Sequence, residues 1–187
     1  MSKNFHNDID HVLVTQEQLD ELTTRLANEI YTDYKDSDRD LLLVCILKGS
    51  MIFTSALMQK IPLPMRIDFM KVSSYGSGTA SSGIINIHLD LKRGDYSNTD
   101  IILIEDIIDS GRTLKHLVEY LKDRGAHSVR TCTLLDKPSR RVVSFSADYV
   151  GMAVPDEFVV GYGLDYDELY RNLPYVGVLK QSVWEKK

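Results

Sequence analysis

Cysteine is scarce in this chain of 187 residues, which contains only Cys45 and Cys132. Both lie inside apolar runs, where a buried free thiol is the ordinary state, and their spacing matches no metal-binding motif. The sequence therefore predicts neither a disulfide nor a cysteine metal site.

Long apolar runs are also missing. No segment approaches the roughly 20 apolar residues that a membrane helix needs. The first ten residues, MSKNFHNDID, lack the apolar stretch of a secretory signal. We therefore expect a cytoplasmic protein that makes no membrane contact.

An excess of basic residues is absent as well. The chain has 22 Lys and Arg against 27 Asp and Glu, which gives a net charge of −5. Such a surface does not attract nucleic acid electrostatically, so we expect small-molecule partners and no nucleic acid. The length suits one compact domain.

Hydrophobic periodicity predicts alternating helices and strands. Thr15 and Gln18 form a capping-box pattern at the start of an amphipathic helix. Strands are then predicted over 41–47, 66–72, 84–90, 100–106 and 128–137, with helices over about 50–60 and 113–124. This alternation indicates an α/β fold with a mostly parallel central sheet flanked by helices. Ligands of such sheets bind beyond the carboxyl ends of the strands.

Beyond residue 150 the segments become shorter and mix glycine with aromatic residues. We expect residues 1–187 to form a single domain. Its core is predicted over about 10–150, and a small hood subdomain is predicted to be built mainly from about 151–187.

Three carboxylates lie close together around the end of the strand predicted at 100–106. Glu105 and Asp106 end its apolar run, and Asp109 precedes Ser110–Thr113 at a helix start. Free amides and hydroxyls at a helix N-terminus form a natural phosphate cradle. Adjacent carboxylates suit ribose hydroxyls and Mg²⁺. The alternative is a helix that Asp109 or Ser110 caps for stability alone.

The segment LIEDIIDSGRTL resembles the phosphoribosyl-diphosphate motif of type I phosphoribosyltransferases, and no Gly-Lys-Ser/Thr P-loop is present. At the level of the hypoxanthine phosphoribosyltransferases the resemblance covers about residues 8–181. It implies the type I phosphoribosyltransferase fold. It also implies a purine-salvage enzyme that transfers 5-phosphoribose from phosphoribosyl diphosphate to hypoxanthine, and also to guanine, giving IMP or GMP and diphosphate.

The resemblance carries over to individual residues that would bind the donor. LKGS at 47–50 resembles a diphosphate loop in which the lysine follows a non-proline cis peptide. The implied donor and nucleotide residues are Lys48, Gly49, Ser74, Tyr75, Glu105, Asp106, Asp109, Ser110, Gly111, Arg112, Thr113 and Arg171. Asp109 is the expected catalytic acid and base, and Glu105, Asp106 and Asp165 are the expected Mg²⁺ residues.

A second set is implied for the purine. Its members are Ile107, Lys137, Phe158, Val159 and Asp165. Lys137 would donate to the 6-oxygen of the base, and because an ammonium group accepts no hydrogen bond, it selects oxo-purines over adenine. The neighbouring arginines in LLDKPSRR are interpreted as solvated surface charges.

Some alternatives stay open. Family members suggest a homodimer or homotetramer. A regulatory or RNA-binding protein with this fold would bind the donor without turnover, although the retained Asp109, Lys137 and Asp165 argue against it. A preference for guanine or xanthine is a further alternative, because backbone carbonyls read the purine 2-position.

The segment SSYGSGTASSG (73–83) has too little apolar area to hold itself closed, and in the family it resembles a lid. We predict that its amides exchange rapidly in the free protein and become protected only when donor and purine, or a transition-state mimic, are bound. Hydrogen exchange measures this. Equal protection in both states would identify a static loop.

Overall fold

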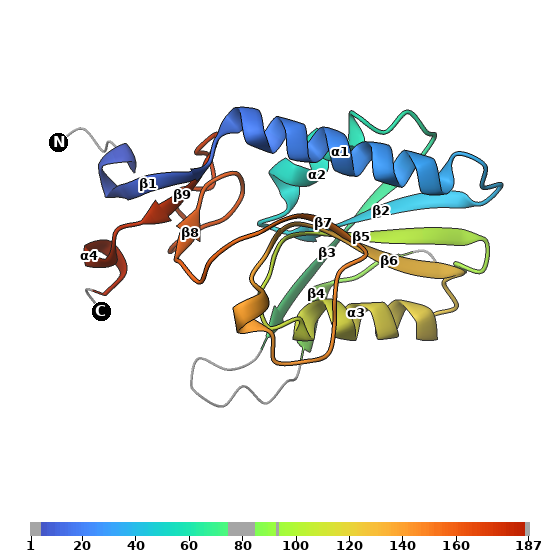
Figure 1. Ribbon diagram of the computed structural model, residues 1–187. Helices are drawn as coiled ribbons and strands as arrows, with labels where there is room; N and C mark the ends of the chain where they lie inside the picture. Colours follow the sequence, from blue (N-terminus) through green and yellow to red (C-terminus); the bar gives the residue numbers. More distant parts are fainter. Residues whose placement is uncertain (1–4, 75–84, 93, 186–187) are drawn as a thin grey trace.

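The computed structural model describes residues 5–74, 85–92 and 94–185 (Figure 1). Its main element is a six-stranded sheet. In spatial order the strands are β4 (Ile85–Leu89), β3 (Arg66–Ser74), β2 (Asp40–Leu47), β5 (Thr99–Ile108), β6 (Ser128–Asp136) and β7 (Tyr149–Ala153). Neighbouring strands are parallel except β3 and β4, which are antiparallel. The predicted mostly parallel α/β sheet is confirmed.

Helices cover both faces of this sheet, with α1 (Gln16–Tyr34) and α2 (Met51–Met58) on one face and α3 (Arg112–Asp123) on the other (Figure 1). Side chains of a strand alternate between the two faces. In β5, Ile102 and Ile104 therefore join the core beneath α1 and α2, whereas Ile101 and Leu103 join the core beneath α3. A strand buried on both faces needs the continuous apolar run that the sequence contains.

The first helix begins as predicted. The Thr15 hydroxyl accepts a hydrogen bond from the Gln18 backbone at 3.3 Å, and the Gln18 side chain accepts one from the Thr15 N–H at 2.9 Å. This capping box satisfies two amides that the helix itself leaves unpaired.

A second, three-stranded antiparallel sheet forms the hood, in the order β1 (Ile9–Val14), β9 (Val176–Leu179) and β8 (Val159–Val160). The short helices η1 (Phe5–Asp8) and α4 (Gln181–Trp184) lie at its outer end, close to both termini (Figure 1). The strand at 9–14 therefore belongs to the hood sheet, and β7 extends the core sheet to residue 153. The division expected near residue 150 misses both.

The predicted lid lies largely outside the described residues. Ser73 and Ser74 continue β3, and the remainder of 73–83, including Tyr75, is not described. Among the described residues no helix is both long enough and apolar enough to cross a membrane.

Candidate phosphate, cation and base site

The candidate site lies where the central parallel strands end, at the edge facing the hood (Figure 1). Strands β2, β5 and β6 end at Leu47, Ile108 and Asp136. Because parallel strands finish at one edge of the sheet, the residues that follow them are brought together there. β5 continues two residues beyond the predicted end, so Glu105 and Asp106 lie within the strand.

The loop between β5 and α3 forms a small cradle. A cavity of about 90 Å³ is lined by Glu105, Ile107, Ile108, Asp109, Ser110, Gly111, Thr113 and Leu114. Gly111 is the N-cap of α3 with φ +79°, a left-handed conformation that favours glycine. Gly111 itself has no side chain to cap the helix, and the Ser110 hydroxyl accepts a hydrogen bond from the Arg112 N–H at 3.4 Å. The helix amides at the N-terminus thus lie beside a cavity, as an anion site requires. The Ser110 hydroxyl thus contributes a cap of the kind that the stability alternative describes, and the cavity beside it is the feature that favours an anion site.

Glu105 and Asp106 serve different parts of the site, since successive strand residues point to opposite faces. Glu105 lines the cradle. The Asp106 carboxylate accepts a hydrogen bond from the Ile107 N–H at 2.8 Å and lies against Gly49, where an added Cβ would be 1.6 Å from Asp106 Oδ2. Only glycine lets the loop after β2 approach this carboxylate so closely.

Both carboxyl groups are harder to ionise than ordinary ones. Burial raises the pKa of Asp106 to about 6, and the negative charge of Asp165 adds to the increase. The Ile107 N–H, the backbone of Asp106 and the positive charge of Arg171 oppose it. Burial also raises the pKa of Glu105 well above its usual range, with a further contribution from the charge of Asp106. A cation or a hydroxyl-rich ligand would favour the ionised forms.

The loop after β2 joins the sheet to the hood. The peptide bond between Leu47 and Lys48 is cis, as the resemblance implies. Gly163 of the hood, with φ +106°, approaches the other side of this loop, and a Cβ on it would be 1.9 Å from the Gly49 carbonyl oxygen. Gly49 is therefore enclosed between Asp106 and Gly163.

Charged side chains from the turn at residues 165–171, here called the hood turn, lie around the loop that follows β2. Lys48 Nζ lies 2.7 Å from Glu168 Oε2. Arg171 pairs with Asp165 Oδ1 at 2.8 Å and donates to the Gly163 carbonyl at 2.8 Å. The buried Arg171 Nε has no hydrogen-bond partner within the described part of the chain. The predicted residues Lys48, Asp165 and Arg171 are thus brought together.

Lys137 follows β6 and is 7% exposed. Its ammonium group donates to the Glu157 carbonyl oxygen at 2.7 Å, and its backbone N–H donates to the Ile108 carbonyl at 3.0 Å. A buried lysine needs such partners. One of its three donors is used by the hood, and the others can serve a ligand.

The other predicted purine residues lie in different surroundings. Phe158 is 38% exposed, and its ring stacks on Trp184 at 5.7 Å between centroids. It also contacts Tyr166 edge-on at 5.5 Å. Val159 is buried in β8, and the half-buried Ile107 packs against the core. Trp184 was not singled out from the sequence, which contains a single tryptophan near its end.

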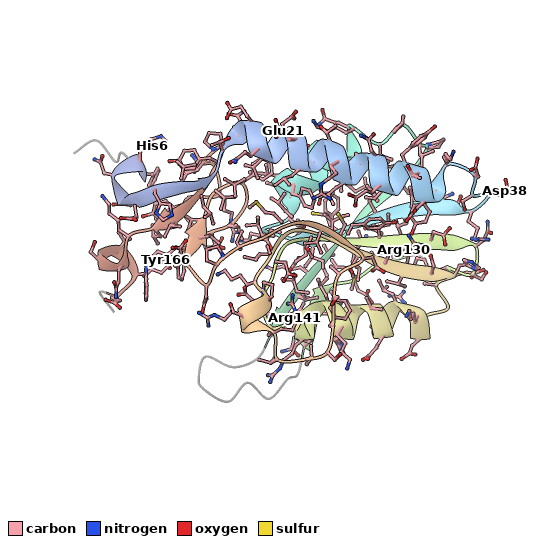
Figure 2. The ribbon with its side chains drawn as sticks, in the orientation of Figure 1. His6, Glu21, Asp38, Arg130, Arg141 and Tyr166 are labelled. Carbon is pink, nitrogen blue, oxygen red and sulfur yellow. The ribbon has the colours of Figure 1, made fainter. Side chains whose placement is uncertain are left out.

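Arg141 is not a solvated surface charge, as it was interpreted from the sequence. Its guanidinium donates to the Asp136 carboxylate and to the Asp109 carbonyl oxygen, and its side chain is 16% exposed. Figure 2 shows Arg141 beside the start of α3. Arg140 does match the interpretation, because its side chain is 60% exposed and pairs with Asp156 on the surface. Arg141 thus connects the Lys137 segment to the cradle.

Carboxylates, histidines and cysteines do not assemble into a ready-made metal cage in the described residues, since no group of three converges on one point. Mg²⁺ is normally held by one or two protein carboxylates together with waters and substrate phosphates. The carboxylates of Glu105 and Asp106 at the end of β5 are of the kind that such a donor set uses.

A roomier hollow of about 800 Å³ lies elsewhere, along α1 and the start of β7. Its side chains already pair with one another, as Arg25 does with Glu29 at 2.6 Å. None of the residues predicted for the site lines it, so the smaller cradle remains the candidate.

Comparison with known proteins places these features in context. Residues 15–167 match the family described as phosphoribosyl transferase domain. A hypoxanthine-guanine phosphoribosyltransferase of Staphylococcus epidermidis is 48% identical over 97% of this chain and 99% of its own length. The bifunctional protein TilS/HprT of Listeria monocytogenes is 49% identical over 99% of this chain. The chain spans 28% of the length of that relative.

Solved structures agree with these matches. A hypoxanthine phosphoribosyltransferase from Staphylococcus aureus has a TM-score of 0.92 and 47% identity, with 98% of each chain covered. A point mutant of the hypoxanthine phosphoribosyltransferase from Trypanosoma cruzi, in a ternary substrates complex, has a TM-score of 0.88 and 36% identity, with 95% of this chain and 99% of that chain covered.

The raised pKa of Asp106 predicts how stability depends on pH. Between its ordinary value of 3.8 and about 6 the folded state binds more protons than the unfolded state, so stability falls as pH rises through this window. Asp106→Asn removes this loss. We expect the variant to be more stable by about 3 kcal/mol at pH 7.5, with the difference vanishing below pH 4.

Urea unfolding between pH 4 and pH 7.5, without divalent cations, measures this difference. Asp123→Asn, on the exposed last turn of α3, is the matched control and should change stability by less than about 0.5 kcal/mol. An Asp106→Asn variant that is less stable than the wild type at pH 7.5 would contradict the prediction.

Proposed function

The chain belongs to the phosphoribosyl transferase domain family, and we propose that it transfers the 5-phosphoribosyl group of phosphoribosyl diphosphate to hypoxanthine and guanine. The products are IMP or GMP and diphosphate, and the role is purine salvage. One observation carries the proposal. The buried Lys137 and the helix N-terminus at Gly111 lie at the same sheet edge, joined through the hydrogen bond from the Lys137 N–H to the Ile108 carbonyl.

Donor binding is divided between the two sides of this edge. The amides and hydroxyls of Ser110–Thr113 would hold the 5-phosphate in the cradle, assisted by the helix N-terminus. Lys48, the Gly49 amide and Arg171 would hold the diphosphate. A guanidinium fork suits phosphate oxygens, and Arg171 keeps a buried Nε without a partner among the described residues.

Mg²⁺ is proposed to bind with the donor. Glu105 and Asp106 would hold it on the ribose side, and Asp165 would hold it near the diphosphate. When bound, Mg²⁺ neutralises the leaving group. The raised pKa values of Glu105 and Asp106 support this assignment, because a nearby cation favours the ionised carboxylates.

The base would be selected by Lys137, an ammonium group that donates hydrogen bonds and accepts none. Lys137 would donate to the 6-oxygen of hypoxanthine or guanine, and it offers nothing to the 6-amino group of adenine. Phe158 and Ile107 would pack against the purine faces, and the Val159 backbone with Asp165 would contact its edge. Trp184 already stacks on one face of the Phe158 ring, so the purine would take the other face.

Proton transfer is assigned to Asp109. It lines the cradle at the end of β5, and its carbonyl oxygen accepts a hydrogen bond from Arg141, which fixes the backbone from which the carboxylate extends. The purine loses a proton as its ring nitrogen bonds to the anomeric carbon, and a positioned carboxylate can accept it. The remaining assistance is positioning of base and donor.

Further parts of the proposal concern the whole protein. We propose a single catalytic domain with a hood, a homodimer or homotetramer, and a cytoplasmic location. Neither nucleic acid nor a membrane is a proposed partner, and the net charge of −5 does not attract nucleic acid electrostatically.

The experiment that tests the function is a comparison of steady-state rates with four bases at saturating donor and Mg²⁺. We expect nucleotide formation with hypoxanthine and guanine, less with xanthine, and only traces with adenine. Binding of the donor without turnover on any base would instead support a donor sensor. Adenine as the best substrate would contradict the role given to Lys137.

Asp109→Asn should lower turnover with hypoxanthine by about 10- to 1000-fold with modest change in donor affinity, since positioned proton transfer contributes on that order. Asp123→Asn on the far end of α3 is the matched control. Turnover equal to that of the wild type would remove Asp109 as the acid and base.

Lys137→Ala should cause a large loss of activity with oxo-purines and no more than trace use of adenine. The variant loses a donor without gaining an acceptor, and it leaves the Glu157 carbonyl without its partner. Kinetics are measured with hypoxanthine and adenine, with Lys115→Ala on the exposed face of α3 as control. Unchanged hypoxanthine kinetics would place the base-reading group elsewhere.

A further inference from the structure

We propose that Glu168 is an internal counter-anion that competes with diphosphate for Lys48 and Arg171, and so weakens the hold of the site on that product. The inference rests on the proposed function, because it takes these two cations as the diphosphate ligands. It assigns a role to a residue of the hood turn that neither the motif nor the resemblance singled out.

One carboxylate oxygen of Glu168 lies close to both cations. Glu168 Oε2 lies 2.7 Å from Lys48 Nζ and 3.5 Å from an Arg171 guanidinium nitrogen. A single carboxylate oxygen therefore bridges the diphosphate loop and the hood. Both positive charges lower the pKa of Glu168, Lys48 most strongly, so the bridging group is a carboxylate at neutral pH.

The backbone holds this carboxylate in place. Asp167, Glu168 and Tyr170 all have positive φ, at 52°, 65° and 73°, although none is glycine. Such conformations are disfavoured for residues with a side chain and persist where the surroundings determine them. The turn is closed by hydrogen bonds from the Glu168 N–H to Asp165 Oδ2 at 3.0 Å and between Tyr166 and Leu169. Figure 2 shows Tyr166 in the hood, beside the C-terminal strands.

Solvent exposure of Lys48 and Glu168 lets diphosphate take the place of the Glu168 carboxylate. The side chains of Lys48 and Glu168 are 51% and 65% exposed, so their ion pair forms and breaks in contact with water and is weak. A diphosphate with several charges can displace it. When diphosphate leaves, Glu168 returns to the two cations, which are then not left unpaired. Arg171 also contacts Asp165 at 2.8 Å, so its position does not depend on Glu168 alone.

Removing the charge should therefore tighten diphosphate binding. Glu168→Gln keeps the size of the side chain and abolishes the competition and the repulsion of an incoming anion. We expect the dissociation constant of magnesium diphosphate to fall by about 3- to 10-fold at low salt, the scale of an exposed ion pair with added charge repulsion. The difference should shrink as salt is raised, because exposed charges are screened.

The test is calorimetric titration of the full chain with inorganic diphosphate in the presence of Mg²⁺. Glu119→Gln, on an exposed position of α3, removes the same charge and should leave binding unchanged. In a Lys48→Gln background the effect of Glu168→Gln should fall by at least half, because the nearer cation is gone. This second comparison separates competition for Lys48 from a general change in the turn.

An unchanged or larger dissociation constant in Glu168→Gln overturns the inference, as does tightening that is equal in Glu119→Gln or independent of salt. Absence of diphosphate binding in both wild type and variant also overturns it. Binding is measured without turnover, so failure of the base-panel assay with tightened diphosphate binding would count against the proposed function alone.

Discussion

The site depends on one close approach, in which Gly49 is enclosed between Asp106 of the central strand and Gly163 of the hood. A Cβ on Gly49 would be 1.6 Å from the Asp106 carboxylate, and a Cβ on Gly163 would be 1.9 Å from the Gly49 carbonyl. The loop after β2, strand β5 and the hood are far apart in the chain, and here they approach one another so closely that a Cβ on either glycine would clash. Each carries a residue proposed to bind the donor or its cation, namely Lys48, Asp106 and Arg171.

This closeness has an electrostatic cost that a ligand can offset. Burial raises the pKa of Asp106 to about 6 and that of Glu105 well above its usual range. In the free protein, ionising either carboxyl group therefore costs more free energy than it does in water. Ionisable groups that lower the folding stability of the free protein and that a bound ligand can stabilise are typical of functional sites. The cations of the same region are meanwhile paired with Asp165 and Glu168.

Local patterns were enough to predict much of this arrangement. The apolar run before Glu105 predicted β5, and the Thr15 capping box predicted the start of α1, because both depend on neighbours in sequence. The motif around Asp109 predicted the cradle, and the family resemblance supplied Lys48, Lys137 and Arg171. The residue roles themselves stay predictions.

Features that depend on distant contacts escaped the sequence. Pairing of β1 with β9 joins residues about 170 positions apart, so nothing near Ile9 indicates that this strand belongs to the hood. Arg141 looks like any surface arginine until Asp136 and Asp109 are brought to it. Glu168 adopts a left-handed conformation that its residue type does not favour, and only the folded turn explains it.

One measurement tests directly whether the site depends on the close approach at Gly49. The initial rate of IMP formation from hypoxanthine is compared in Gly49→Ala and Gly94→Ala, each with its fold checked by circular dichroism. Within the described part of the chain, no non-adjacent residue places an atom within 4 Å of a Cβ added to Gly94, so its variant should keep the rate of the wild type. Gly49→Ala must displace the Asp106 carboxylate, and the account predicts that the rate falls by about 100-fold or more, as misplacement by an ångström can cause. A Gly49→Ala variant that is folded and as fast as the Gly94→Ala control would contradict the account.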